Sequence, residues 1–160
     1  MKEINYRGGI VCFRLPETWR EEYEDAGGGT FYEEKPGSGT LRLNVIDSKK
    51  PADAPDAKSA LLAFMDRTRP ADSSLRIVGN GNILCRYTKP ATEDGEELVM
   101  HYWEIGNAVG STQARLALFS FSVPASAGAS EGTLRDVAML EEELAAAELC
   151  EHLGDLPALH

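Results

Sequence analysis

Short segments in which apolar and polar residues alternate run through most of the chain and predict β-strands. Leu41, Leu43 and Val45 alternate with polar residues, which is the pattern of a half-buried strand. Pro16 ends an earlier strand, because proline cannot donate to the hydrogen-bond ladder. The predicted strands comprise residues 10–15, 30–34, 40–46, 75–78, 83–89, 97–105 and 114–123.

Two of these strands, residues 97–105 and 114–123, carry apolar side chains on both faces. The alternation in the first of them separates Leu98, Met100 and Tyr102 from Val99, His101, Trp103 and Ile105. A strand that is apolar on both faces is covered on both sides and lies near the centre of its sheet.

The connections follow from turn-forming residues. Asn80-Gly81 is a strong signal for a tight hairpin between two strands. Residues 90–95 are expected to form an acidic loop, and residues 17–26 fit either a short helical turn or an extended connection.

Apolar residues at helical spacing predict two helices. The first runs from Pro55 to Arg69, since Pro70 restricts the residue before it, and buries Ala57, Ala60, Leu61, Phe64 and Met65. The second begins near Thr133, which forms a capping box with Asp136, and ends at Gly154 and Pro157.

The order of elements predicts one α+β domain over residues 1–160, with a frayed tail at about 154–160. Strands that follow one another as hairpins pair antiparallel. The expected architecture is therefore a mainly antiparallel sheet of six to seven strands covered by helices.

Composition narrows the classes of function. The net charge of −10 argues against binding to nucleic acid or an anionic membrane, whereas it permits a basic protein partner. Cys12, Cys85 and Cys150 are widely spaced and are expected to be reduced. With no apolar run of signal-peptide or membrane-spanning length, we expect a cytoplasmic protein.

No catalytic, cofactor or metal site is predicted. His101 could face Ser120 or Cys85 on an adjacent strand, but no Gly-x-Ser-x-Gly motif supports such a pair. The glycines at 27–29 and 79–81 lack the features of phosphate loops and are interpreted as turns.

Two surfaces are candidates for a protein partner. The first is an acidic stretch with interleaved aromatic residues, namely Trp19, Glu21, Glu22, Tyr23, Glu24 and Asp25. Trp19 is also placed to plug the edge of the core behind Pro16. The second candidate is the strand that carries His101 and Trp103.

The segment from Phe13 to Trp19, a strand followed by Pro-x-x-Trp, resembles the opening of the superfamily that includes PsbP, the Ran-binding Mog proteins and the DcrB-like proteins. The glycine-preceded strand at Gly29–Tyr32 and the strand at Leu43–Ile46 extend this resemblance. It implies an α/β/α sandwich and a non-enzymatic binding role.

The leading hypothesis is therefore a cytoplasmic protein-binding module without catalysis, acting as an adaptor, chaperone or regulator. One alternative is an enzyme or small-ligand binder with a pocket around Tyr87, His101, Trp103 and Arg115. Another is a toxin-neutralising immunity protein. An open edge strand would also permit a homodimer.

Overall fold

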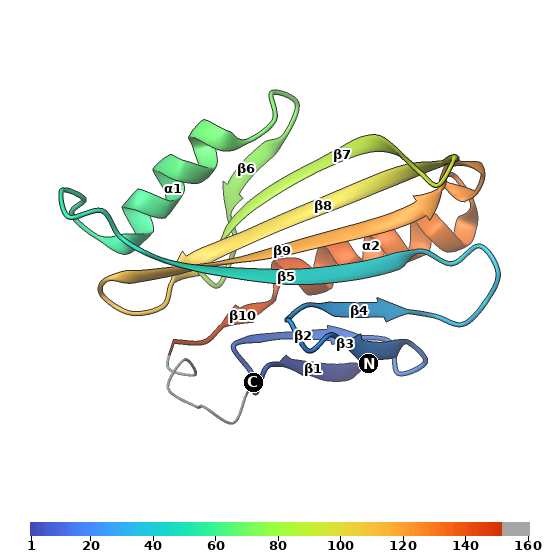
Figure 1. Cartoon of the computed structure of the whole chain (residues 1–160), viewed down its shortest axis with the longest axis horizontal. Coiled ribbons are helices and arrows are strands. Elements are labelled where there is room, and N and C mark those ends of the chain that lie inside the picture. The colour runs from blue at the N-terminus through green and yellow to red at the C-terminus, as the bar shows by residue number, and fades with distance from the viewer. Residues whose placement is uncertain (152–160) are drawn as a thin grey trace.

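The computed structural model describes residues 1–151, which form a seven-stranded sheet, a three-stranded sheet and two α-helices (Figure 1). The strands are β1 (Lys2–Tyr6), β2 (Val11–Leu15), β3 (Arg20–Tyr23), β4 (Gly29–Tyr32), β5 (Thr40–Lys49), β6 (Ser74–Ile77), β7 (Ile83–Glu93), β8 (Glu96–Ala108), β9 (Gln113–Pro124) and β10 (Glu148–Leu149). The helices are α1 (Ala57–Thr68) and α2 (Glu131–Ala145), and a 3₁₀ turn spans Ala125–Ala127.

The large sheet is antiparallel, in the order β3-β4-β5-β9-β8-β7-β6. This confirms the predicted α+β class and the central position of β8 and β9. The strand predicted at residues 10–15 lies elsewhere. It pairs as β2 with β1 and β10 in the small sheet.

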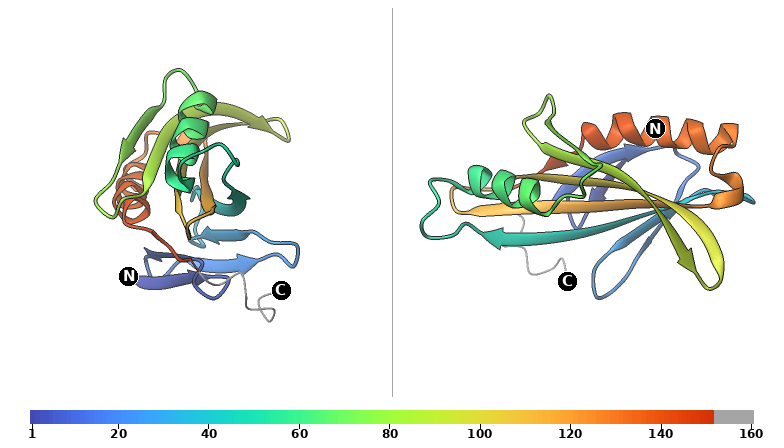
Figure 2. Two further views of the ribbon diagram at one scale, coloured as in Figure 1. Left: turned by 90° about the vertical axis from the view of Figure 1, so that its left-hand side faces the viewer. Right: turned by 90° about the horizontal axis from the view of Figure 1, so that it is seen from above.

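The large sheet has two faces with different covers. The inner face carries Trp103, Ile105, Ala117, Phe119 and Phe121, and it packs against α2 and the small sheet in the main core. The outer face carries Met100, Tyr102, Glu104, Leu116 and Leu118. Figure 2 shows α1 and α2 on opposite sides of these strands.

Helix α1 covers only one end of the outer face. Leu61 and Met65 pack there against Ile83, Cys85 and Leu116. At Gly106 of β8 a Cβ atom would lie 2.7 Å from Leu61 Cδ2, so glycine allows the helix to approach this closely. The expectation that helices cover both faces therefore holds for the inner face and for only part of the outer face.

The first helix ends where the sequence predicted but begins two residues later than Pro55, and the second differs at both ends. The N-cap of α1 is Asp56, whose carboxylate accepts from Ser59 N–H at 2.7 Å, and the helix ends before Arg69. In α2 the cap is Ser130 instead of Thr133, and its hydroxyl accepts from Thr133 N–H at 3.2 Å.

Helix α2 also ends earlier than Gly154. The side-chain amides of Asn80 and Asn82 donate to the Ala147 carbonyl at 2.6 and 2.7 Å, and the chain then pairs with β2 as β10. Residues 154–160, which were expected to fray, lie outside the described residues.

The structure corrects one predicted connection, residues 90–95, and decides between the two alternatives for another, residues 17–26. Residues 90–93 continue β7, and the turn is reduced to Asp94-Gly95, both with positive φ. Pro90 is tolerated because β6 pairs only with residues 83–86, which leaves that edge of β7 open. Within residues 17–26, the extended alternative is correct, because residues 20–23 form β3.

Candidate functional site

A groove of about 740 Å³ lies between α1, the connector that follows β5, and the outer face of the large sheet. Leu116 and Leu118 of β9, Glu104 of β8 and Tyr87 of β7 form its floor, and Ile46 of β5 lies beside it. The wall on the helix side is made by Ala57, Ala60, Leu61, Ala63 and Phe64.

The groove leaves large apolar side chains in contact with solvent. Phe64 is 44% exposed and Ile46 is 53% exposed. The sequence pattern placed Phe64 on the buried side of its helix. In the structure only Ala57, Leu61 and Met65 of that set are buried, because α1 contacts the end of the sheet with a narrower stripe than the pattern predicted.

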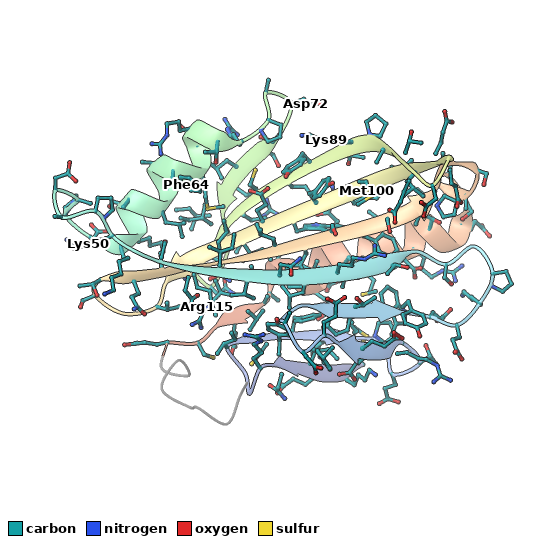
Figure 3. The ribbon with its side chains drawn as sticks, viewed as in Figure 1. Lys50, Phe64, Asp72, Lys89, Met100 and Arg115 are labelled. Atoms are coloured by element: carbon teal, nitrogen blue, oxygen red, sulfur yellow. The ribbon has the colours of Figure 1, made fainter. Side chains whose placement is uncertain are left out.

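Basic residues surround this apolar groove. Lys49, Lys50, Arg67 and Lys89 line it, against two acidic residues, Asp53 and Glu104. None of the four basic side chains forms a salt bridge with any residue between 1 and 151. Figure 3 labels Lys50, Phe64 and Lys89, which come from three different elements around the groove.

Aromatic rings hold two of these cations in place. The Lys89 ammonium lies 5.4 Å from the centre of the Tyr87 ring, and the Arg67 guanidinium 5.7 Å from that of Phe64. Tyr87 stacks on Tyr102 at 4.8 Å and donates a hydrogen bond to Glu104. Burial, followed by Glu104, raises the pKa of the Tyr87 hydroxyl, so it remains a protonated donor.

The groove has the chemistry of a binding site. Its aliphatic hydroxyl groups belong to Ser48 and Thr68, and no histidine is among the lining residues to act as their base. An apolar floor and a few polar groups at the edge are typical of sites that hold a ligand by burial and orient it by charge.

The four residues expected to form a pocket around His101 do not meet in one site. Tyr87 faces the outer side of the sheet, whereas His101, Trp103 and Arg115 face the inner side. Ser120 and Cys85 also lie on the outer face, so His101 reaches neither of them. The structure therefore does not pair His101 with Ser120 or Cys85, the arrangement for which the sequence offered no motif.

His101 belongs instead to a cluster beneath α2. Its Nδ1 lies 3.0 Å from Nη2 of Arg86, which also pairs with Glu141 at 2.5 Å and lies 4.3 Å from the centre of the Trp103 ring. Trp103 is fully buried, and its indole N–H has no hydrogen-bond partner within the described part of the chain.

The environment of His101 makes stability depend on pH. Burial, and then the Arg86 charge, lower its pKa, while Glu141 raises it by a smaller amount. The unfolded chain therefore binds the proton at higher pH than the folded chain, so stability is lost as the pH falls below about 6.5. We expect the free energy of unfolding to fall more steeply between about pH 7 and 5 in the native protein than in His101→Gln. Denaturant titrations at several pH values measure this dependence. If the free energy of unfolding changes equally with pH in both proteins, the prediction is contradicted.

The acidic stretch is divided between core and surface. Trp19 is buried and stacks on Phe121 at 6.1 Å, which confirms its role as a core-edge plug. Trp19 and Trp103 are therefore not accessible to a partner in this conformation. The rest of the stretch, Glu21, Glu22, Tyr23, Glu24 and Asp25, is exposed along β3 and the following loop.

Glu21 and Tyr23 are tied to their neighbours within this stretch. Tyr23 donates to Glu21 at 2.6 Å, and Lys2 pairs with the same carboxylate at 2.9 Å. These two contacts, the tyrosine first, lower the pKa of Glu21. A partner-binding role for this surface stays a prediction.

The remaining features of residues 1–151 concern metal sites, membrane-spanning helices and cysteines. No group of three or more histidine, cysteine, aspartate or glutamate side chains in this range is arranged to hold a metal ion. No helix in the same range is long and apolar enough to cross a membrane. The three cysteines are free, and burial, together with Cys150, raises the pKa of Cys12 to about 11.

Comparison with known proteins shows the fold and leaves the activity open. No family model and no curated protein matches the chain. A crystal structure from Bacteroides thetaiotaomicron is similar at 21% identity and a TM-score of 0.60, over 94% of this chain and 49% of that one. The chain thus spans about half the length of that protein.

Two further solved structures are similar. LpqN, described as involved in cell envelope biogenesis of Mycobacterium tuberculosis, is 15% identical with a TM-score of 0.54, over 81% of this chain and 78% of LpqN. The cyanobacterial PsbP of Synechocystis is 12% identical with a TM-score of 0.37, over 92% and 91% of the two chains. The Bacteroides protein and LpqN share the fold of this chain.

Proposed function

We propose that this chain is a non-catalytic protein-binding module and that it binds its partner in the groove beneath α1. The observation that carries the proposal is the incomplete cover of the outer face, where Ile46 and Phe64 remain exposed above an apolar floor. Contiguous exposed apolar surface with a polar edge is typical of interaction sites. A groove beside a helix is also a recurring way of holding a partner segment.

A matched pair of variants tests this role. Ile46→Asp places a charge in the groove at a position that is 53% exposed, so the fold should persist. Leu134→Asp makes the same change on α2, outside the groove lining, at a position that is 58% exposed. We expect at least one protein to be retained from a lysate of the source organism by the native chain and by Leu134→Asp, but lost with Ile46→Asp.

Circular dichroism and thermal unfolding of each variant serve as the control for folding. If the native chain and both variants retain the same set of proteins, the groove is not the binding site. Quantitative mass spectrometry of the three eluates gives this comparison directly.

A small-ligand site is a second candidate, because the groove volume of about 740 Å³ is that of small-molecule pockets. A rise in melting temperature with an apolar compound that disappears in Ile46→Asp would favour this reading. A partner protein that competes with the compound would show that both use the same groove.

A further inference from the structure

We infer that the groove takes an amphipathic helix of the partner whose apolar side is flanked by acidic residues. This inference rests on the proposed function and adds the conformation and the charge of the bound segment. It gives the groove a partner of the opposite charge to the one expected for the exposed acidic stretch at residues 21–25.

The backbone in the middle of the groove leaves no place for an added strand, although β5 beyond Leu43 and β7 beyond Arg86 have open edges at its two sides. The middle of the floor lies on β8 and β9, and each of these strands is hydrogen-bonded to a neighbour on both sides. A segment laid across them therefore finds no free backbone N–H or C=O groups there. Its own backbone groups must be paired internally, as they are in a helix.

The shape of the apolar surface suits one side of such a helix. Leu116 and Leu118 form the floor, and Phe64 and Ile46 rise from different elements beside them. A helix presents large side chains at i, i+3, i+4 and i+7 along one side, which would fill this surface and shield Phe64 and Ile46 from water.

The charge of the groove lining indicates which residues flank the apolar side of the bound helix. The whole chain carries 16 basic and 26 acidic residues, yet the groove is lined by four basic and two acidic ones. Asp53 is exposed, and Glu104 accepts a hydrogen bond from Tyr87. The four basic side chains have no salt-bridge partner in residues 1–151. They come from β5, the connector, α1 and β7, and so surround the groove.

These cations would select the partner more than they would strengthen its binding. Exposed ion pairs each contribute little to affinity, whereas complementary charge raises the association rate and disfavours wrong partners. An acidic helix would meet positive charge on several sides of the groove, and a basic helix would be repelled.

Synthetic peptides of about 18 residues test the inference. The first has leucine and phenylalanine at helical spacing with flanking glutamates, the second replaces every glutamate by lysine, and the third scrambles the first. Binding of each labelled peptide to the full chain is measured by fluorescence anisotropy at about 0.05 and 0.5 M salt. We expect the acidic peptide to bind at least about tenfold tighter than the other two, and more weakly at high salt.

Charge reversal in the protein provides the matched control. Lys49→Glu/Lys89→Glu changes two groove residues, and Arg76→Glu/Arg135→Glu makes the same change in net charge at exposed residues outside the groove lining. We expect the first variant to lose about tenfold or more in affinity for the acidic peptide and to gain affinity for the basic one, with a much smaller change in the second.

The outcomes separate this inference from the proposed function. Equal binding of acidic and basic peptides that Ile46→Asp abolishes would overturn the inference and leave the groove as a protein-binding site. Equal binding of the acidic and scrambled peptides would overturn the helical conformation. Binding of laurate in the groove without binding of any peptide would overturn the inference in favour of an anionic amphiphile.

Discussion

Replacing Phe119 by alanine is expected to lower the free energy of unfolding by about 3–5 kcal/mol. Phe119 lies on β9 with 1% of its surface exposed, opposite Trp103 on β8 and Leu43 on β5. Its ring meets that of Phe13 edge-on at 5.1 Å. Since Phe13 belongs to the small sheet, the substitution opens a cavity where the two sheets join.

Equilibrium unfolding in urea measures this effect, and circular dichroism shows whether the variant still folds. Leu134→Ala is the control. Its side chain is 58% exposed on α2, so the change in stability should stay within about 0.5 kcal/mol. A loss of less than about 1 kcal/mol in Phe119→Ala would mean that the contact between the sheets is not a close-packed core.

Replacing Arg115 by alanine is expected to lower the free energy of unfolding by about 2–4 kcal/mol, because a buried guanidinium and its hydrogen bonds are lost. Arg115 is 2% exposed, and its Nε and Nη2 donate to the two carboxylate oxygens of Asp47 at 2.7 and 2.9 Å. Its Nη1 donates to the carbonyls of Ile10 and Cys150. Removing the guanidinium takes a donor from both carbonyls and from the carboxylate. The Ile10 carbonyl keeps the Cys150 N–H at 3.1 Å, and the Asp47 side chain is 46% exposed to water.

The conservative substitution sharpens this test. Lysine has no planar fork, so Arg115→Lys should recover only a small part of the lost stability. Arg42→Ala, an exposed arginine on β5, should change the free energy of unfolding by no more than about 0.5 kcal/mol. If Arg115→Lys has the same free energy of unfolding as the native protein, the guanidinium hydrogen bonds to the two carbonyls do not contribute to stability.

Local patterns were sufficient for most of the large sheet. The two-sided alternation of residues 97–105 and 114–123 correctly predicted central strands, because strands with neighbours on both sides carry apolar side chains on both faces. The residue pattern failed at Pro90, where the pairing of the neighbouring strand determines whether a proline is tolerated. Pro90 signalled a loop, yet it lies on an edge that β6 leaves open, where no donor is required.

The groove was beyond the reach of local patterns. Ile46, Phe64 and Leu118 come from three separate segments, and no spacing in the sequence shows that they meet. Phe64 and Met65 occupy neighbouring positions on α1 and both fit its apolar stripe, yet Met65 is buried and Phe64 is exposed. Only the position of the helix at the end of the sheet separates them.

The pairing of β10 with β2 has a consequence for the order of folding during synthesis. Glu148 and Leu149 complete a sheet whose other strands, β1 and β2, are synthesised well before them. The edge of β2 that faces away from β1 stays open until β10 has emerged. Contacts so distant in sequence close slowly, since the entropy of a long loop is lost before they form. During that interval the β2 backbone at Val11 and Cys12 is free to pair with chaperones or with other chains.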